Sequence, residues 1–442
     1  MHKSSFIIAA PTSNSGKTTI TLGLLRALKN RGKEVQPFKS GPDYIDPKFH
    51  GIACGKTGVN LDLFMMTEQH LKETYLDYIA TSEIQCIEGV MGLFDGAKKA
   101  ERSTAELAKK LNLPIIFVVD AKAVAYSVAP LLYGFKNFDP SLNIVGVIFN
   151  RVNTKSHYKF LQEASEDVGI KALGYVPFLE DCKIQSRHLG LSIANLKEYD
   201  KKITAIAKQI EKTVHLNQLL DLTTYAETTH TKQKAVPPIA PLTIGVAKDE
   251  AFNFSYSQNI NALKKIGKVV FFSPIKDEKL PQTDVLYFPG GYPECYVKNL
   301  AENKAMLSAI KEYAENEGVI IAECGGMMYL GKNMIDQNGD SYPMANVFSF
   351  SSSMKAMKLH LGYRTIHLDE YTFKGHEFHY SEVYGDENIE TVGQIFSARN
   401  QEVPTKIYKY KNVLASYIHL YFGEANQFKS ITNYITDKTL QL

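Results

Sequence analysis

A short stretch near the N-terminus constrains the fold of this chain more than any other: Ala10-Pro-Thr-Ser-Asn-Ser-Gly-Lys-Thr-Thr19. It follows an apolar run at residues 6–10, which is typical of a buried strand, and it precedes residues 18–31, whose apolar residues recur at helical spacing. A loop of small residues between a strand and a helix N-terminus offers backbone N–H groups and the helix dipole to an anion. The stretch therefore predicts a P-loop that binds the phosphates of a nucleotide.

The loop departs from the usual GxxxxGK[ST] pattern, because Pro11 stands where the first glycine is expected. Lys17 is expected to contact the β- and γ-phosphates as a point charge, and Thr18 to offer its hydroxyl to Mg²⁺. The loop residues that we expect to bind ATP are Ser13, Asn14, Ser15, Gly16, Lys17, Thr18 and Thr19.

Polar residues also follow other expected strands, at the position where open α/β sheets bind ligands. Asp43 and Asp46 come after the strand at residues 35–38, and each can either hold Mg²⁺ or cap a turn. Glu88 ends the strand at residues 84–88, where a Walker B acid would stand, and Mg²⁺ on ATP prefers one or two carboxylates. Asn150 ends another strand and can read an adenine edge or act as a cap, and both options stay open.

Strand and helix patterns alternate across the first 180 residues, which predicts a doubly wound parallel sheet of α/β class. Residues 223–241 are rich in Thr, Lys and Pro, as linkers are, and a new α/β pattern starts at Leu242. We expect a P-loop ATP-binding synthetase domain at residues 1–215, a linker at 216–241 and a second doubly wound domain at 242–442.

The second domain contains a cysteine on an expected strand-to-helix turn, Glu323-Cys324-Gly-Gly. This is the geometry of a nucleophile elbow, in which the helix N-terminus lowers the thiol pKa and the N–H of Gly325 holds an oxyanion. Gly290 and Gly291 form a second turn rich in N–H groups. His419, after a late strand pattern, is the expected base.

A rival histidine cluster lies in Lys374-Gly-His-Glu-Phe-His-Tyr-Ser381. Strand alternation puts His376 on one face and Glu377, His379 and Ser381 on the other. We expect a structural or interface role for this segment rather than a metal site.

Composition excludes several classes of function. Basic and acidic residues nearly balance, at 50 and 47, so no overall charge recruits nucleic acid or a membrane surface. The 5 cysteines contain no CxxC pair, which argues against a disulfide framework or a structural zinc site and favours a reducing cytoplasm. No signal peptide is evident and no apolar run approaches the ~20 residues that a membrane span requires.

Taken together, these motifs resemble those of the cobyrinic acid a,c-diamide synthases, glutamine-dependent amidotransferases of corrinoid synthesis. The resemblance covers the whole length. Its motifs are the P-loop at 10–19, Lys39–Pro47, Glu88–Gly96, Arg187–Leu191, Pro289–Glu294, Ala322–Gly326 and Ser416–His419.

The resemblance implies a synthetase domain like that of dethiobiotin synthetase, and a flavodoxin-like class I glutamine amidotransferase domain. By position, Asp43 and Glu88 complete the Mg²⁺ site with Thr18. Cys324 is then the glutaminase nucleophile and His419 its base, and the residues near the acceptor carboxylates are Lys39, Tyr44 and Asp95. Many class I glutaminases place a glutamate two residues after the histidine, whereas Tyr421 stands there in this chain, and Glu424 is one candidate for the third group.

The implied reaction amidates two side-chain carboxylates of a corrin-type tetrapyrrole through acyl phosphates, with ATP, Mg²⁺ and ammonia from glutamine. Hydrogenobyrinic acid and nickel sirohydrochlorin are alternative acceptors to cobyrinic acid, and a homodimer is possible. Cobyric acid synthase is a related alternative, disfavoured by Lys39–Pro47. A non-enzymatic ATP switch would carry a signature lysine where this chain has Thr12.

Overall fold

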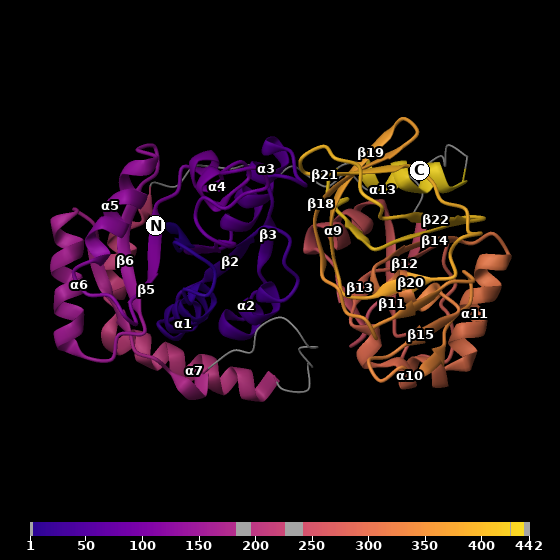
Figure 1. Cartoon of the computed structure of the whole chain (residues 1–442), viewed down its shortest axis with the longest axis horizontal. Coiled ribbons are helices and arrows are strands. Elements are labelled where there is room, and N and C mark those ends of the chain that lie inside the picture. The colour runs from indigo at the N-terminus through magenta and orange to yellow at the C-terminus, as the bar shows by residue number, and fades with distance from the viewer. Residues whose placement is uncertain (1–2, 183–195, 226–241, 425, 437–442) are drawn as a thin grey trace. The chain divides into compact units, whose positions relative to one another are not determined.

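The computed structural model describes residues 3–182, 196–225, 242–424 and 426–436. The chain divides into two compact units, Met1–Gln233 and Lys234–Leu442, and each is described by itself. In Figure 1 the first unit runs from indigo to magenta and the second from orange to yellow. The motif Arg187–Leu191 and residues 226–241 of the expected linker lie outside the described residues.

The first unit is built on a parallel sheet with strand order β3-β2-β4-β1-β5-β6-β7. The strands are β1 (Lys3–Ala9), β2 (Val35–Ser40), β3 (Val59–Leu61), β4 (Ile84–Glu88), β5 (Ile115–Asp120), β6 (Ile144–Asn150) and β7 (Lys171–Val176). Nearly all their residues are buried, as the continuous apolar runs indicate. The register pairs Ile8 with Glu88, so the end of β4 lies beside the start of the P-loop.

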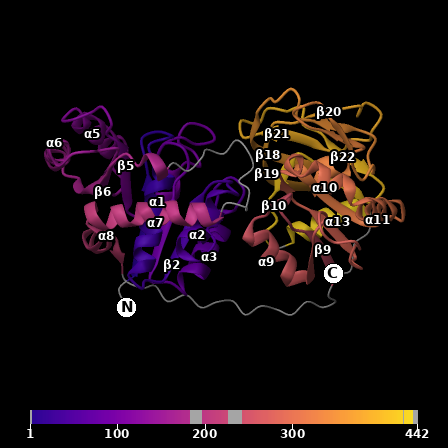
Figure 2. The same cartoon turned by 90° about the horizontal axis from the view of Figure 1, so that it is seen from below.

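Helices cover both faces of this sheet, which confirms the doubly wound expectation. They are α1 (Lys17–Asn30), α2 (Asp46–Cys54), α3 (Glu68–Ile79), α4 (Thr104–Leu111), α5 (Val128–Phe138), α6 (Lys155–Asp167), α7 (Leu196–Thr213) and α8 (Leu216–Leu222). Phe6 and Ile8 share a core cluster with α1 and α7, while Phe117 contacts Phe135 of α5, 4.9 Å between ring centroids. Figure 2 shows α7 lying across α1.

The first unit extends beyond residue 215, where the sequence analysis ended the domain. Residues 216–225, which we expected to be linker, form α8 and the short strand β8 (Thr224–Tyr225). Leu216 and Leu219 are buried in the core, and β8 pairs antiparallel with β1. Leu216, Leu219 and Leu220 do recur at helical spacing, so a signal was available, but the sequence analysis assigned this short segment to the Thr- and Pro-rich linker that follows it.

The second unit has a sheet with strand order β11-β9-β12-β14-β23-β22, parallel except for β22. Its strands are β9 (Leu242–Ala247), β11 (Gly267–Phe272), β12 (Val285–Phe288), β14 (Val319–Glu323), β22 (Ile407–Tyr410) and β23 (Val413–Ser416). The helices of this unit are α9 (Ser257–Ile266), α10 (Val297–Glu302), α11 (Lys304–Glu315), α12 (Gly325–Leu330) and α13 (Gln427–Thr436). The expected second α/β domain is therefore confirmed.

Antiparallel and mixed sheets accompany this core and were not foreseen. One has the order β21-β18-β19-β24 and consists of β18 (His360–Leu368), β19 (Tyr371–His379), β21 (Gln394–Ser397) and β24 (Ile418–Leu420). Others contain β15 (Asn333–Ile335), β16 (Ser341–Pro343), β17 (Ser351–Ser353) and β20 (Glu382–Tyr384), and β10 (Phe252–Phe254) with β13 (Gly290–Gly291). The pairing of β19 with β24 sets His376 opposite His419.

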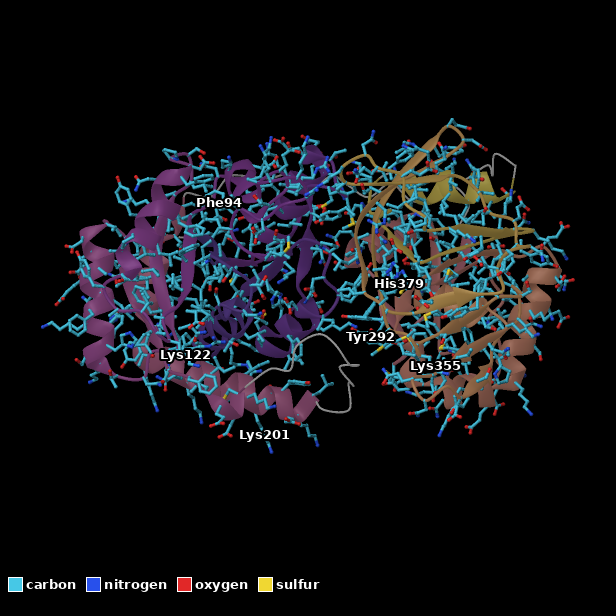
Figure 3. All side chains as sticks on the ribbon, in the orientation of Figure 1. Phe94, Lys122, Lys201, Tyr292, Lys355 and His379 are labelled. Atoms are coloured by element: carbon cyan, nitrogen blue, oxygen red, sulfur yellow. The ribbon has the colours of Figure 1, made fainter. Side chains whose placement is uncertain are left out.

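Charged side chains lie mainly at the periphery of each unit. Lys122, Lys201 and Lys355, which are labelled in Figure 3, are exposed, whereas His379 of the second unit is only 8% exposed. Among the described helices, none is long and apolar enough to cross a membrane.

The contact between α1 and α7 gives a test of the fold that holds the P-loop helix. Ile206 of α7 is fully buried, and a Cβ atom on Gly23 of α1 would lie 2.6 Å from its Cγ2 atom. Replacing Ile206 with Ala should lower the free energy of unfolding by about 2–4 kcal/mol, because it leaves a cavity. Calorimetry of the unfolding transition that ATP shifts to higher temperature would measure this change. Lys208→Ala, at an exposed position of α7, is the control, and its free energy of unfolding should stay within about 0.5 kcal/mol of the wild-type value.

Candidate active sites

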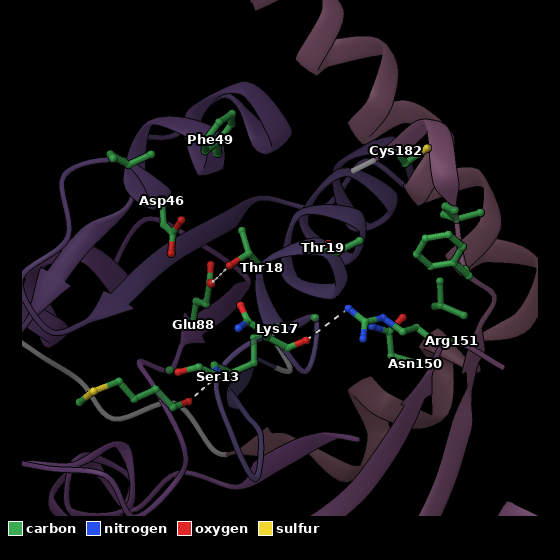
Figure 4. Close-up of a pocket in the computed structure, with 18 of the residues that line it drawn as sticks. Ser13, Lys17, Thr18, Thr19, Asp46, Phe49, Glu88, Asn150, Arg151 and Cys182 are labelled. Carbon is green, nitrogen blue, oxygen red and sulfur yellow. Dashed lines mark hydrogen bonds between the residues drawn. The ribbon is translucent and has the colours of Figure 1, made fainter. Parts of the chain in front are cut away.

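The P-loop and the ends of neighbouring strands surround a cavity of about 600 Å³ in the first unit. Gly16 precedes α1 with a φ of 96°, in the left-handed region that favours glycine. Lys17 donates from Nζ to the carbonyl oxygens of Met91 and Thr12, and Ser15 donates to Thr12 O at 2.9 Å. Figure 4 shows Lys17, Thr18, Glu88 and Asn150 around this cavity.

Glu88 is a buried carboxylate held by three side chains. The Thr18 hydroxyl donates to Oε1 at 2.6 Å, Lys39 Nζ lies 3.1 Å from Oε1, and His50 Nε2 lies 2.8 Å from Oε2. Burial by itself would raise the pKa of Glu88, but Lys39, His50 and Thr18 together hold it well below its usual range. The carboxylate therefore stays ionised beside the P-loop.

The two aspartates that follow β2 have different roles in the structure. Asp43 Oδ1 accepts hydrogen bonds from the backbone N–H groups of Ile45 and Asp46, at 2.8 and 3.0 Å, so Asp43 caps the start of α2. Asp46 lines the cavity instead, and its Oδ2 lies 2.5 Å from Lys39 Nζ. The assignment of Asp43 to the metal site is thus not what the geometry favours, and Asp46 is the aspartate that reaches the cavity.

Three residues expected near the acceptor carboxylates differ in placement. Lys39 lines the cavity but is 1% exposed and bound to Glu88 and Asp46. Asp95 Oδ2 accepts from Gly92 N at 2.9 Å within the loop after β4. Tyr44 precedes α2 and is half-buried. In the structure Lys39 therefore forms buried ion pairs with Asp46 and Glu88, whereas the resemblance suggested only that it lies near the acceptor carboxylates.

Asn150 braces the P-loop from β6. Its Nδ2 donates to Ser15 O at 3.0 Å, and a Cβ atom on Gly16 would lie only 2.0 Å from the same nitrogen. The neighbouring Arg151 pairs with Asp120 at 2.5 Å. Contact of Asn150 with an adenine edge stays a prediction.

His50 and one wall of the cavity were missed by the sequence analysis. His50 follows Asp46 by four residues on α2, the spacing of one helical face, and this was the available signal. The missed wall is apolar, which suits a nucleobase, and consists of Phe49, Val176, Pro177, Phe178, Leu179 and Cys182.

The second site centres on Cys324, which forms the predicted elbow between β14 and α12. Its backbone is strained, with a φ of 47° and a ψ of −107°, and its N–H donates to Ser416 O at 2.7 Å. Because β24 follows closely after Ser416, this hydrogen bond ties the elbow to the strand that carries His419.

Gly290 shows how closely the two expected catalytic residues approach each other. A Cβ atom on Gly290 would lie 2.2 Å from Cε1 of His419 and 3.3 Å from Cβ of Cys324. Only glycine fits between them. The structure therefore brings together Cys324, His419 and the glycine turn, which are far apart in the sequence.

The other glycines of this site also make close backbone contacts. A Cβ atom on Gly325 would lie 3.1 Å from Gly291 N, so the two expected oxyanion donors are neighbours. Gly291 itself approaches Ala251 so closely that its Cβ would lie 1.8 Å from the Ala251 carbonyl oxygen. Their role as oxyanion donors stays a prediction.

The expectation that the helix lowers the thiol pKa was wrong. Burial raises the pKa of the Cys324 thiol well above its usual range, and Glu294, Glu323 and Glu377 add to this rise. The α12 helix has 6 residues, and the hydrogen bond from Gly325 does not outweigh burial. The Cys324 thiol is therefore held in its neutral form.

The segment 374–381 frames this site. His376 stacks on His419 with 4.9 Å between ring centroids, and its Nδ1 lies 2.9 Å from Tyr256 Oη. On the opposite face, His379 Nε2 lies 2.8 Å from Glu377 Oε1, while Arg364 Nε donates to Glu377 Oε2 at 2.7 Å. Among the described residues, His360, Glu377 and His379 offer ligand atoms within 4.8 Å of one another, but the Arg364 charge disfavours a cation there and favours the structural role.

A pair of glycine variants tests the fit of the P-loop against Asn150. Replacing Gly16 with Ala forces its Cβ into the Asn150 amide and should weaken ATP binding about tenfold or more, measured by calorimetry. Gly32→Ala is the matched control, because Gly32 has a φ of 76° but no other described atom within 4 Å of its Cβ position. Equal ATP affinity in the two variants would contradict the proposed fit.

Comparison with known proteins assigns a family model to each of the two units. Residues 6–191 match the CobQ/CobB/MinD/ParA nucleotide binding domain, and residues 243–427 match the CobB/CobQ-like glutamine amidotransferase domain. Cobyrinate a,c-diamide synthase of Caldanaerobacter subterraneus subsp. tengcongensis is 38% identical over 429 residues, or 94% of each chain. The protein of that name from Picrophilus torridus is 39% identical over 436 residues, or 96% of each chain, and that from Salmonella typhimurium is 38% identical over 440 residues, or 95% of each chain. The chain therefore belongs to the cobyrinate a,c-diamide synthase family of glutamine-dependent amidotransferases and is an amide-forming ligase.

Proposed function

We propose that this enzyme uses ATP and glutamine to amidate the a and c side-chain carboxylates of cobyrinic acid. One observation supports this most directly: the chain has both a P-loop beside Glu88 and an elbow at Cys324 that lies close to His419. The same chain matches such synthases over nearly its whole length. An ATP switch would not need the cysteine elbow, and family membership sets that alternative aside.

The first site would activate the acceptor carboxylate. A carboxylate does not react with ammonia at neutral pH, so transfer of the ATP γ-phosphoryl group would convert it to an acyl phosphate, which ammonia then attacks with loss of phosphate. Lys17 would bind the β- and γ-phosphates and offset the charge that develops on them. Lys39, held between Asp46 and Glu88, would keep these carboxylates in place.

The residues around Glu88 fit a magnesium ion. The Thr18 hydroxyl and the Glu88 carboxylate lie 2.6 Å apart and are hard oxygen donors, and Asp46 adds a second carboxylate to the cavity. Thr18 and Glu88 would hold the ion, with Asp46 as the nearby aspartate. Bound with ATP, Mg²⁺ would supply positive charge to the phosphate oxygens.

The second site would release ammonia from glutamine. His419 would take the proton of the Cys324 thiol, and the sulfur would attack the amide carbon to form a tetrahedral intermediate whose oxygen faces Gly291 and Gly325. The protonated His419 would then return its proton to the leaving nitrogen as ammonia departs. Water would hydrolyse the resulting thioester to glutamate and restore the thiol.

The ring of the acceptor defines the main alternatives, which are hydrogenobyrinic acid and nickel sirohydrochlorin. Incubating the enzyme with each macrocycle, ATP, Mg²⁺ and glutamine, and weighing the products, would identify the acceptor. Amidation of cobyrinic acid at two carboxylates supports the proposal, and exclusive amidation of another ring contradicts it. A homodimer is also proposed, and light scattering would test it.

The two sites make separable contributions, which a Cys324 variant tests. Cys324→Ser should abolish amidation driven by glutamine, because a serine hydroxyl is a much weaker nucleophile in this buried site. Amidation driven by ammonium chloride should stay within about twofold of the wild-type rate. Loss of both activities in a folded variant would contradict the assigned division of labour.

A Glu88 variant tests the first site. Glu88→Gln removes the charge beside Thr18 and should lower amidation from both nitrogen sources by roughly 10–100-fold, while glutamine hydrolysis at Cys324 stays measurable. Glu68→Gln is the matched control, because Glu68 is exposed and pairs only at the surface with Lys72 and Lys110. Its rates should equal those of the wild type in steady-state assays.

A further inference from the structure

The glutaminase site contains a buried acid that the chemistry so far does not use. Class I glutaminases often orient the catalytic histidine with a glutamate two residues after it, whereas this chain has Tyr421 there. Glu323, the last residue of β14, lies directly before the nucleophile and is 2% exposed. Its Oε2 atom is 3.9 Å from Nδ1 of His419.

We infer that Glu323 is the residue that positions the ring of His419. Glu323 lies at the end of β14, directly before the nucleophile Cys324, and not on β24, the strand that carries His419. The inference rests on the glutaminase roles proposed for Cys324 and His419. An acid at Nδ1 would favour the tautomer with its proton on Nδ1, which leaves Nε2 to accept the thiol proton. Catalytic hydrogen bonds are often long in unliganded enzymes, and the 3.9 Å separation would shorten when His419 becomes charged.

The carboxyl group of Glu323 is fixed by neighbours on two sides. Tyr287 of β12 donates its hydroxyl to Oε2 at 2.9 Å, and the backbone N–H of Leu420 donates to Oε1 at 3.1 Å. Leu420 directly follows His419, so the acid is tied to the backbone of the base as well as facing its ring. A carboxyl held in this way loses little freedom when it orients the imidazole.

Asn259 of α9 holds the same segment from its other side. Its Nδ2 donates to Leu420 O at 2.8 Å, and its Oδ1 accepts from Phe422 N at 3.0 Å. Glu323 and Asn259 thus fix the backbone around His419 from two different elements. The fixed backbone keeps the ring of His419 beside Gly290 and the elbow.

The balance of charge explains why an acid is needed there. Burial lowers the pKa of His419 well below its usual range, and the nearby His376 and His379 lower it further while Glu377 opposes them. Proton transfer from Cys324 would create an imidazolium that burial disfavours. An ionised Glu323 at Nδ1 stabilises this cation during attack on the amide, until the proton passes to the leaving ammonia.

The titratable groups around Glu323 also predict how glutamine hydrolysis depends on pH. They are Tyr287 on β12, Cys324 next in the chain and His419 on β24. Burial raises the pKa of Glu323 to about 8, and the hydroxyl of Tyr287 and the N–H of Leu420 partly oppose this rise. Below this pH the carboxyl is protonated and gives less support to the imidazolium, so kcat/KM for glutamine should rise with pH through about 8.

The test is glutamine hydrolysis by the full-length Glu323→Gln variant, followed across pH. Glutamine keeps the size of the side chain and an oxygen that can accept from Leu420 N, but it carries no charge. We expect kcat to fall about 10–100-fold, KM for glutamine to stay within about threefold, and the rising limb near pH 8 to be lost. Amidation from ammonium chloride, which we assign to the first unit, should be unchanged, while the retained KM for glutamine shows that the second unit is folded.

Tyr287→Phe and Glu424→Gln complete the design. Because the Tyr287 hydroxyl lowers the pKa of Glu323, Tyr287→Phe should move the rising limb to higher pH without removing it. Glu424→Gln, the other candidate acid, should keep the limb in place. A Glu323→Gln rate within twofold of wild type overturns the inference, and so does a lower rate with an unchanged limb, which would make the role purely structural.

Failure of the inference is distinct from failure of the proposed function. If Cys324→Ser retained glutamine-driven amidation, the nucleophile itself would be misassigned, and the pH profile of Glu323→Gln would then not concern this site. If Cys324→Ser lost that activity while Glu323→Gln matched the wild type, only the role of Glu323 would be overturned.

Discussion

Parallel strand pairing is the constraint on which both sites depend. In the first unit the pairing of Ile8 with Glu88 sets the acid at the level of the P-loop, although the two segments are separated by some 70 residues. In the second unit the pairing of Glu323 with Ser416 brings the elbow to the strand that leads to His419. Because the carboxyl ends of parallel strands share one edge of a sheet, backbone hydrogen bonds between strands bring together the segments that form each site.

The two sites then use burial in opposite ways. At the P-loop, Glu88 and Asp46 are buried next to Lys39 and His50, and these partners outweigh the desolvation that would neutralise the acid. At the elbow, desolvation dominates: the Cys324 thiol and the His419 ring are both shifted toward their neutral forms. Under the proposed function, the first site would hold phosphates and a cation and so needs permanent charges, whereas the second would form a thioester and needs charge only while the proton moves.

Much of this organisation could be predicted from the sequence, because the governing patterns are local. The P-loop, Glu88 at the end of its strand and the elbow at Cys324 each follow from a strand and turn read over about ten residues. The distinction between Asp43 and Asp46 could not be made, because it depends on which side chain caps the helix and which points to Lys39. The thiol pKa was mispredicted for a similar reason, since the burial of Cys324 involves segments far away in the sequence, such as β19, whose Phe378 carbonyl oxygen lies 4.0 Å from Cys324 Sγ.

In both sites a glycine allows a close contact that any side chain would prevent. At the P-loop, a side chain on Gly16 would overlap the Asn150 amide that braces the loop from β6, and at the elbow a side chain on Gly290 would overlap the ring of His419 from β24. In each case the colliding group comes from a strand more than 100 residues away, so a short-range motif alone does not explain the glycine. The missing side chain instead admits a distant group to van der Waals contact with the backbone. These two glycines are therefore required by tertiary contacts and not only by their local motifs. Asn150 and His419 can occupy their positions in the two sites only because Gly16 and Gly290 have no Cβ atom.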